Sequence, residues 1–199
     1  MTSRVVVVPV TTHDPADDRP AELLDAMLED VVDMAAAMPQ AEAALAFVAA
    51  AVDRAEAVAW PGMARHAVAS LAATDVLAAA GVGEGSAVVL VAPDVPDLPP
   101  LLVGKLFSAL TSAEVAACPA DGGGLVALGA RLPVADWLRE LAPSLDAADM
   151  LARLQQAAPV RALSVGPGWH RIRRVADTAR LDEGLQGWDA TRAWLSAAG

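Results

Sequence analysis

The chain has 199 residues, of which 55% are hydrophobic, and its formal net charge at pH 7 is −11. A chain of this length can bury a substantial core, so we expect a single domain over residues 1–199 that needs no disulfide or structural metal. The acidic balance argues against a nucleic-acid binder, which needs a basic face, but not against a nucleotide substrate, because a divalent ion can supply positive charge locally.

The first half of the chain predicts strands and helices in alternation. Residues 4–10 are apolar and mostly β-branched, which is typical of a buried strand, and residues 21–38 carry apolar side chains on one helical face. Residues 43–51 are predicted as a second strand, although their many alanines are also compatible with a helix. Residues 56–60 are predicted as a short third strand, and residues 66–80 as a second helix.

Three glycines at positions 81, 83 and 85 follow this helix and precede the next strand. A dinucleotide-binding fingerprint needs the opposite order, in which a strand leads through the glycines into a helix. We therefore interpret Gly81 as the helix cap and residues 81–85 as a tight turn. The only lysine, Lys105, has no glycine-rich loop before it, so a Walker-type phosphate site is not predicted either.

The second half of the chain continues the alternation. Strands are predicted at residues 87–92, 115–118, 125–130 and 160–165, and helices at residues 100–110, 134–141, 147–157 and 189–198. Such alternation predicts an α/β fold, which we expect to be a three-layer αβα sandwich with a mixed, mostly parallel sheet. Trp188 and Trp194, in and beside the last helix, are expected to pack against the core, or alternatively against a second subunit of a homodimer.

Several other classes of site are not supported. The three histidines have no metal-ligand spacing to one another or to Cys118, so a zinc site is not predicted. Cys118, the only cysteine, is interpreted as a core residue and fits a reducing compartment. No window reaches the ~18 unbroken apolar residues of a spanning helix, and the first apolar run is too short for a secretory signal. We expect a cytoplasmic protein without membrane or nucleic-acid partners.

Carboxylates stand where predicted strands end. Asp94 and Asp97 follow the apolar strand at residues 87–92, Asp121 opens an Asp-Gly-Gly segment before the strand at residues 125–130, and Asp177 lies near the C-terminus. Taken singly, each is explained by an ordinary turn or helix cap. The carboxyl edge of an open α/β sheet is, however, where such folds bind ligands.

In these segments the sequence resembles the GT-A, or nucleotide-diphospho-sugar transferase, superfamily. It is most similar to a small bacterial glycosyltransferase-like family of unassigned activity related to phospholactate guanylyltransferase. In that family a hydrophobic strand ends in Asp-x-Pro-x-Leu, which residues 94–98 match, and Asp-Gly-Gly precedes another strand, which residues 121–123 match. A later segment, Asp/Asn-Thr-Pro-x-Asp-Leu, is matched in part by residues 177–182, with Ala179 in place of proline.

The resemblance implies a metal-dependent transfer of a glycosyl or nucleotidyl group from a nucleotide-activated donor to a small acceptor. By position, Asp94 would be the catalytic residue and, with Asp177, would hold Mg²⁺ or Mn²⁺ against the nucleotide, since carboxylates suit these hard ions. The resemblance also suggests contacts to the nucleotide and to the substrate, the first from Pro9, Arg19 and Arg173, the second from Asp97, Asp121, Gly122 and Gly123.

The loop after the first strand departs from the superfamily pattern. That loop usually contains glycine and basic residues that hold phosphates, whereas residues 11–18 contain neither and carry three carboxylates. Arg19 is the nearest cation in sequence, and Arg171, Arg173 and Arg174 could supply phosphate contacts from the other side. The acidic loop favours an alternative function, that of a catalytically degenerate member acting as a ligand-binding or interaction scaffold.

The two functions differ in their expected geometry. In an active transferase, Asp94 and Asp177 converge on one cleft that also holds a cation near the first-strand loop. In a scaffold, the two carboxylates diverge, or the loop fills the cleft with its own carboxylates.

Overall fold

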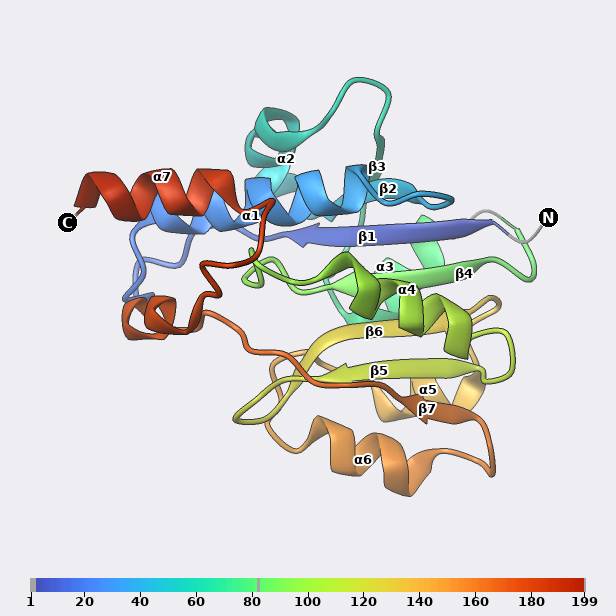
Figure 1. Ribbon diagram of the computed structural model, residues 1–199. Helices are drawn as coiled ribbons and strands as arrows, with labels where there is room; N and C mark the ends of the chain where they lie inside the picture. Colours follow the sequence, from blue (N-terminus) through green and yellow to red (C-terminus); the bar gives the residue numbers. More distant parts are fainter. Residues whose placement is uncertain (1–2, 82, 199) are drawn as a thin grey trace.

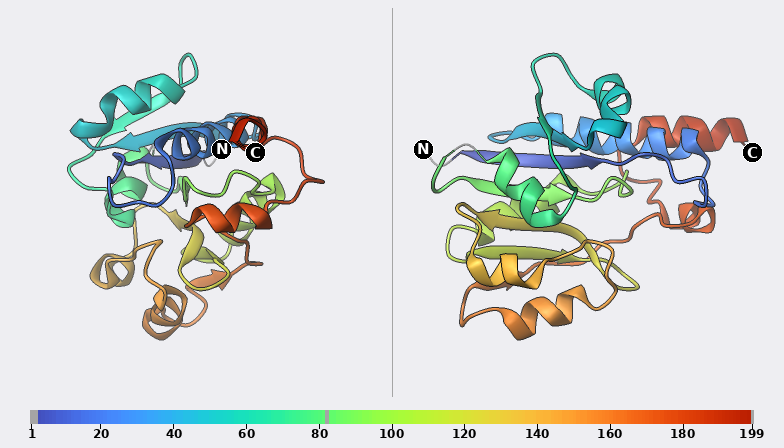
Figure 2. Two further views of the ribbon diagram at one scale, coloured as in Figure 1. Left: turned by 90° about the vertical axis from the view of Figure 1, so that its left-hand side faces the viewer. Right: turned by 180° about the vertical axis from the view of Figure 1, so that it is seen from behind.

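The computed structural model describes residues 3–81 and 83–198, and in this part of the chain seven strands form one sheet. Helices α1, α4 and α7 lie in front of the sheet in Figure 1, and α3 and α5 cover its other face in Figure 2. The predicted three-layer αβα architecture is therefore confirmed. None of the described helices combines the length and apolar character that crossing a bilayer requires.

The elements follow one another in the order that the sequence predicts, apart from the region between residues 49 and 72. The strands are β1 (Arg4–Val10), β2 (Glu42–Phe47), β3 (Ala64–Ala67), β4 (Ala87–Val91), β5 (Val115–Pro119), β6 (Leu125–Arg131) and β7 (Leu163–Val165). The helices are α1 (Ala21–Ala36), α2 (Val52–Val58), α3 (Ala73–Ala80), α4 (Pro100–Ala109), α5 (Asp136–Leu141), α6 (Met150–Ala157) and α7 (Asp189–Ala198), with short 3₁₀ helices η1 (Ala49–Ala51) and η2 (Val175–Arg180).

The sheet is mixed and mostly parallel, as predicted. Its strand order is β3-β2-β1-β4-β6-β5-β7, and β6 is antiparallel to its neighbours β4 and β5. From β1 the chain moves outward to β2 and β3, then returns through α3 to β4 on the other side of β1. Because the connections leave β1 and β4 in opposite directions, a crevice opens beyond the carboxyl ends of these two strands.

The core consists of aliphatic side chains from both faces of the central strands. Val5–Val8 of β1 and Val88–Leu90 of β4 are at most 2% exposed, as expected of parallel strands that helices cover on both faces. A second cluster joins Leu23 and Met27 of α1 to Ile172, Leu181 and Trp188. The predicted core placement is confirmed for Trp188, which is 2% exposed, while Trp194 is partly buried and packs against this cluster.

Residues 49–72 differ from the prediction. The second strand ends at Phe47, and the predicted third strand at residues 56–60 is wrong, because η1 and then α2 occupy residues 49–58. The third strand is β3, which pairs with β2 and overlaps the first two residues of the segment predicted as helix, and α3 begins only at Ala73. Strand β3 reads Ala-Arg-His-Ala at the sheet's edge and is largely exposed, so it carries no apolar pattern by which a strand could be recognised.

The glycines before β4 form the predicted cap and turn, although Val82 between them lies outside the described residues. Gly81 follows α3 in an extended conformation, with φ −81° and ψ 141°, rather than in a left-handed one. A Cβ at Gly81 would lie 1.7 Å from Leu132 Cδ1, so close packing, not backbone conformation, requires this glycine. Gly83 and Gly85 have φ of +85° and +80°, which favour glycine in a tight turn.

The chain after β7 runs back along the carboxyl edge of the sheet before α7 packs on α1 (Figure 1). Ala120 and Trp169 form a bridge, and the Ile172 amide donates a hydrogen bond to the Asp94 carbonyl at 2.9 Å. On the way, Cys118 Sγ donates to the Pro167 carbonyl, and burial raises the pKa of the Cys118 thiol to about 12. Cys118 is therefore a core residue, as predicted.

Candidate functional site

A cavity of about 510 Å³ lies beyond the carboxyl ends of β1 and β4, where the fold places its crevice. Its volume falls in the range of small-molecule sites. The charged side chains that line it come from distant parts of the chain, namely Asp14, Asp17, Arg19, Arg54, Asp94, Asp146, Arg171 and Arg173. A larger cavity of about 760 Å³ surrounds Arg4 and Arg131 at the opposite edge, and it contains none of the predicted site residues.

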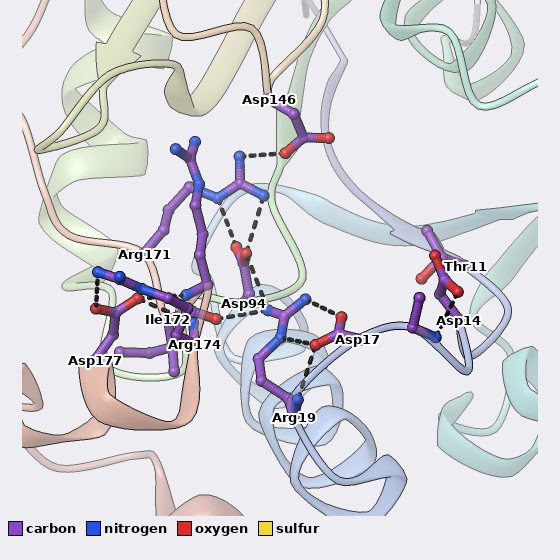
Figure 3. Close-up of polar contacts among 12 residues, drawn as sticks. Thr11, Asp14, Asp17, Arg19, Asp94, Asp146, Arg171, Ile172, Arg174 and Asp177 are labelled. Atoms are coloured by element: carbon purple, nitrogen blue, oxygen red, sulfur yellow. Dashed lines mark hydrogen bonds and ion pairs between the residues drawn. The ribbon is translucent and has the colours of Figure 1, made fainter.

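Asp94 lies at this cavity, as predicted, and Arg171 holds its carboxylate. Arg171 Nε donates to Asp94 Oδ1 at 2.7 Å, and Nη2 donates to Oδ2 at 3.0 Å (Figure 3). Both side chains are 6% exposed. Burial lowers the pKa of Arg171, but the charges of Asp94 and Asp146 outweigh it, so the guanidinium stays firmly protonated. Asp94 and Arg171 thus form a buried, bidentate ion pair between the end of β4 and the C-terminal segment.

Two arginines contact the acidic loop after β1, and one of its three carboxylates, Asp17, forms an ion pair with Arg19. Arg19 donates through Nε to Asp17 at 2.8 Å and through Nη1 to the Ile172 carbonyl at 2.6 Å. The hydrogen bonds from Arg19 lower the pKa of Asp17 to about 2. From α2, Arg54 Nη1 donates to the Thr11 carbonyl at 2.8 Å. The predicted cation near the first-strand loop is therefore present.

Arg173 is the cavity arginine whose guanidinium lacks partners. Its Nε and Nη2 atoms are buried and form no hydrogen bond with any described residue. Burial and the charge of Arg171 lower the pKa of Arg173. Nη2 lies so close to Gly124 that a Cβ there would be 2.6 Å from it. A partly buried charge without an ion pair is unfavourable, so an anion that enters the cavity would be stabilised at Arg173.

Asp97 does not line the cavity, because it is buried beneath the C-terminal segment. Its carboxylate accepts hydrogen bonds from Trp169 Nε1 at 3.1 Å and from the Asp182 amide at 3.0 Å. His170 Nε2 lies 3.0 Å from its second oxygen. Burial raises the pKa of Asp97, but these contacts outweigh burial and hold it below its usual range. In this structure Asp97 fastens residues 169–182 to the end of β4.

Asp177 caps η2 and does not line the cavity. Its Oδ2 accepts hydrogen bonds from the amides of Arg173 and Arg174, both at 3.0 Å (Figure 3). Arg174 Nη2 lies 3.6 Å from the other oxygen, and the Arg174 side chain is 73% exposed. The structure therefore does not bring the two predicted metal ligands together on one cleft.

The Asp-Gly-Gly segment forms the turn between β5 and β6, away from the cavity. Asp121 pairs with Arg180 at 2.8 Å on the surface. Gly122 and Gly123 have φ of +81° and +103°, which a tight turn demands of glycine. A Cβ at Gly123 would also lie 2.9 Å from the Ala148 carbonyl oxygen. Turn geometry and packing thus account for these three residues, and their predicted substrate contact stays a prediction.

The donor set does not fit a divalent ion as the described residues are arranged. Mg²⁺ and Mn²⁺ need several oxygen ligands around one point, but both Asp94 oxygens are engaged by Arg171 and Asp177 is directed at backbone amides. Within residues 3–81 and 83–198, no three His, Cys, Asp or Glu side chains form a group that could hold a metal.

Sequence reasoning named Pro9, Arg19, Asp94 and Arg173, all of which line the cavity, but it missed two charged neighbours. Arg54 lies in α2, between segments that were predicted as strands. Asp146, which pairs with Arg171 at 2.8 Å, lies in a loop without a motif. The basic cluster after β7 was a visible signal for Arg171, but nothing in the sequence paired it with Asp94.

A family model decides the classification of the chain. The model described as "Uncharacterized protein conserved in bacteria (DUF2064)" matches residues 30–144. The chain belongs to this family. The DUF2064 match includes Asp94 but ends before Arg171 and Arg173, which complete the cavity. No protein of curated function matches the chain in sequence.

Solved structures show that this DUF2064 chain has the fold of the nucleotide-diphospho-sugar transferases. A protein from Desulfovibrio desulfuricans G20, provisionally described as such a transferase, is 17% identical, with a TM-score of 0.70 over 97% of this chain and 95% of that one. CMP:2-keto-3-deoxy-manno-octonic acid synthetase complexed with CTP is 13% identical, with a TM-score of 0.60 over 100% of both chains. Glucosyl-3-phosphoglycerate synthase from Mycobacterium tuberculosis, in complex with Mg²⁺ and uridine diphosphate, is 16% identical, with a TM-score of 0.56 over 90% of this chain and 74% of that one.

Proposed function

We propose that the chain transfers a glycosyl or nucleotidyl group from a nucleotide-activated donor to a small acceptor, and that the donor binds in the cavity beyond β1 and β4. The observation that carries this proposal is the partly buried Arg173 side chain, which lines that cavity and whose Nε and Nη2 atoms form no hydrogen bond with any described residue. A cation without a partner in a preformed pocket suits a phosphate, whose oxygens accept charge-assisted hydrogen bonds. The CTP and UDP bound by two proteins of the same fold support a nucleotide as the carrier of that phosphate.

The proposed reaction requires neutralisation of the charge on the leaving phosphate and does not require a protein nucleophile. An acceptor oxygen forms a bond to the donor's sugar carbon or α-phosphorus, and its proton passes to the departing phosphate. The bond from that centre to the leaving phosphate breaks, and a nucleoside diphosphate or a pyrophosphate departs with the electron pair. Arg173 would stabilise the negative charge that accumulates on the leaving phosphate, a form of catalysis that depends on positioning. In this proposal Asp94 acts at the site by holding Arg171 in place.

The scaffold alternative rests on a different observation. Most of the cavity's charges already pair with one another, Arg171 with Asp94 and Asp146, and Arg19 with Asp17. Such internal pairing would suit a protein that keeps the fold without binding a donor. The two functions differ in whether Arg173 receives an anion.

Calorimetric titration tests the proposed function. Wild-type protein is titrated with CTP, GTP, UDP, GDP and sugar derivatives of the diphosphates, in buffers with Mg²⁺ or Mn²⁺ and with a chelator. Binding of at least one nucleotide, followed by release of its diphosphate or pyrophosphate when candidate acceptors are added, supports the transferase. If the folded protein gives no binding heat with any nucleotide in any of these buffers, the transferase function is wrong and the scaffold function is supported.

A further inference from the structure

The charge arrangement around Asp94 differs from that of a metal site in one decisive respect. A carboxylate that binds a metal ion faces it without a competing positive charge, but Asp94 Oδ1 and Oδ2 accept from Arg171 Nε and Nη2 at 2.7 and 3.0 Å. Arg19 Nη1 lies 3.5 Å from Oδ2 as well. A divalent ion at Asp94 would therefore lie beside two guanidinium charges that repel it.

Several protein groups hold the Arg171 guanidinium in this position. Its Nη1 donates to the carbonyls of Leu145 and Leu125 at 3.0 and 3.2 Å and lies 2.8 Å from Asp146 Oδ1. The side chain is 6% exposed. A guanidinium fixed by two backbone carbonyls and two carboxylates provides a permanent positive charge, and it cannot be removed by a chelator.

Arg173 supplies what Arg171 cannot. The donors of Arg171 are directed at protein oxygens, whereas Nε and Nη2 of Arg173 have no partner among the described residues. Both arginines line the same cavity and come from one segment, two residues apart. Arg171 thus neutralises Asp94, whereas the Arg173 side chain lines the cavity without an ion pair to any described residue.

We propose that in this chain the Arg171–Arg173 pair takes the place of the divalent ion, so that the donor's diphosphate is bound directly by arginine and without metal. This inference rests on the proposed function. Arginine suits the task because its planar fork donates two parallel hydrogen bonds to phosphate oxygens and is more weakly hydrated than an ammonium group. The ligand class that follows is a nucleoside diphosphate or its sugar ester.

The test compares metal dependence with arginine dependence. UDP, GDP and CDP are titrated into wild type, Arg173→Gln and Arg139→Gln, each with EDTA and with Mn²⁺. Arg139 is a matched control because its side chain is 49% exposed on α5 and pairs with Asp136 outside the cavity. Arg173 forms no ion pair, so its replacement leaves no partner charge behind, and thermal unfolding checks that the variant is folded. Arg173→Lys tests whether charge alone is sufficient.

The expected result is nucleotide binding whose affinity changes less than about twofold between EDTA and Mn²⁺, and which Arg173→Gln weakens about tenfold or more in both buffers. Arg139→Gln is expected to bind as wild type does, and Arg173→Lys to bind between the two. Nucleotide binding that occurs only with Mn²⁺, or that Arg173→Gln leaves intact, overturns the inference while leaving the proposed function standing. No binding in either buffer overturns the proposed function itself.

Discussion

Asp94 illustrates what a single residue's position in the sequence can and cannot predict. Its place at the carboxyl edge follows from the apolar run before it, because a buried strand must end where polar residues begin. Its partner could not be predicted, since Arg171 lies 77 residues further along and reaches Asp94 only through the path of the C-terminal segment. A motif thus located the carboxylate, whereas its ion-pair partner in the fold is a distant arginine.

Substitution of Gly124 tests whether Arg173 must hold its position in the cavity. Its φ is +78°, and an added Cβ would lie 2.5 Å from the Leu145 carbonyl oxygen and 2.6 Å from Arg173 Nη2. Gly124→Ala is expected to lower the free energy of unfolding and to weaken nucleotide binding, because the methyl group displaces the Arg173 guanidinium. Chemical denaturation and calorimetric titration measure the two effects.

Gly122→Ala is the matched control for that change. Gly122 has φ +81°, and a Cβ there would meet nothing within 4 Å. Both variants carry the strain of a left-handed alanine, about 1 kcal/mol, but only Gly124→Ala adds the clash. Equal stability and equal nucleotide affinity in the two variants would show that Gly124 does not hold Arg173 in place.

At the scale of elements, α7 is fastened to α1 by one buried carboxylate. Asp30 of α1 accepts hydrogen bonds from the amides of Ala190 and Thr191, at 2.9 and 2.8 Å, in the first turn of α7. Asp30 is 2% exposed, and this burial raises its pKa from 3.8 to about 6 despite the hydrogen bonds. The carboxylate therefore combines a capping role, which favours its charged form, with a desolvation cost, which opposes it.

This raised pKa predicts a pH dependence of stability. Between about pH 4 and pH 6 the folded protein keeps a proton on Asp30 that the unfolded chain has released, so the free energy of unfolding falls as pH rises through this window. The two pKa values differ by about 2 units, which corresponds to about 3 kcal/mol. Asn cannot titrate, so the stability of wild type relative to Asp30→Asn is expected to decrease by this order between pH 4 and pH 7.

Urea unfolding of both proteins at several pH values measures that difference. Because every other titrating group is common to both proteins, subtraction isolates Asp30. A difference that stays flat with pH, or that increases as pH rises, would mean that the amide hydrogen bonds of α7 outweigh the burial of the carboxylate.

The sequence mispredicts the elements whose own side chains carry no clear pattern of buried apolar residues. Strand β3 pairs only with β2 at the edge of the sheet and exposes most of its residues, so no alternation marks it. The preceding residues 56–60 are rich in alanine and valine and resemble a strand, yet helix α2 extends to Val58. Strands β1, β4, β5 and β6 were predictable because they are buried almost completely and read as continuous apolar runs.

At the scale of the whole molecule, the segment after β7 joins the two halves of the sheet. It pairs with Asp94 through Arg171, is held by Asp97 through Trp169, and continues into α7, which packs on α1. Elements from both ends of the chain thus meet over the crevice between β1 and β4. The sequence could not predict this closure, because the segment between residues 166 and 188 has neither strand nor α-helical periodicity and is positioned by individual polar contacts.

The Asp94–Arg171 pair therefore carries a prediction about the stability of the whole molecule. Removal of one partner leaves the other as a buried charge with one remaining ion-pair contact, Asp146 for Arg171 and Arg19 for Asp94. Asp94→Ala and Arg171→Met are therefore each expected to lower the free energy of unfolding by up to about 3–5 kcal/mol. The double variant leaves no buried charge at this pair and should cost clearly less than the sum of the single variants. Chemical denaturation of wild type and the three variants gives the coupling as a double-mutant cycle. Strictly additive losses would mean that the two groups do not stabilise each other, and that the C-terminal segment is held over the crevice by its remaining contacts.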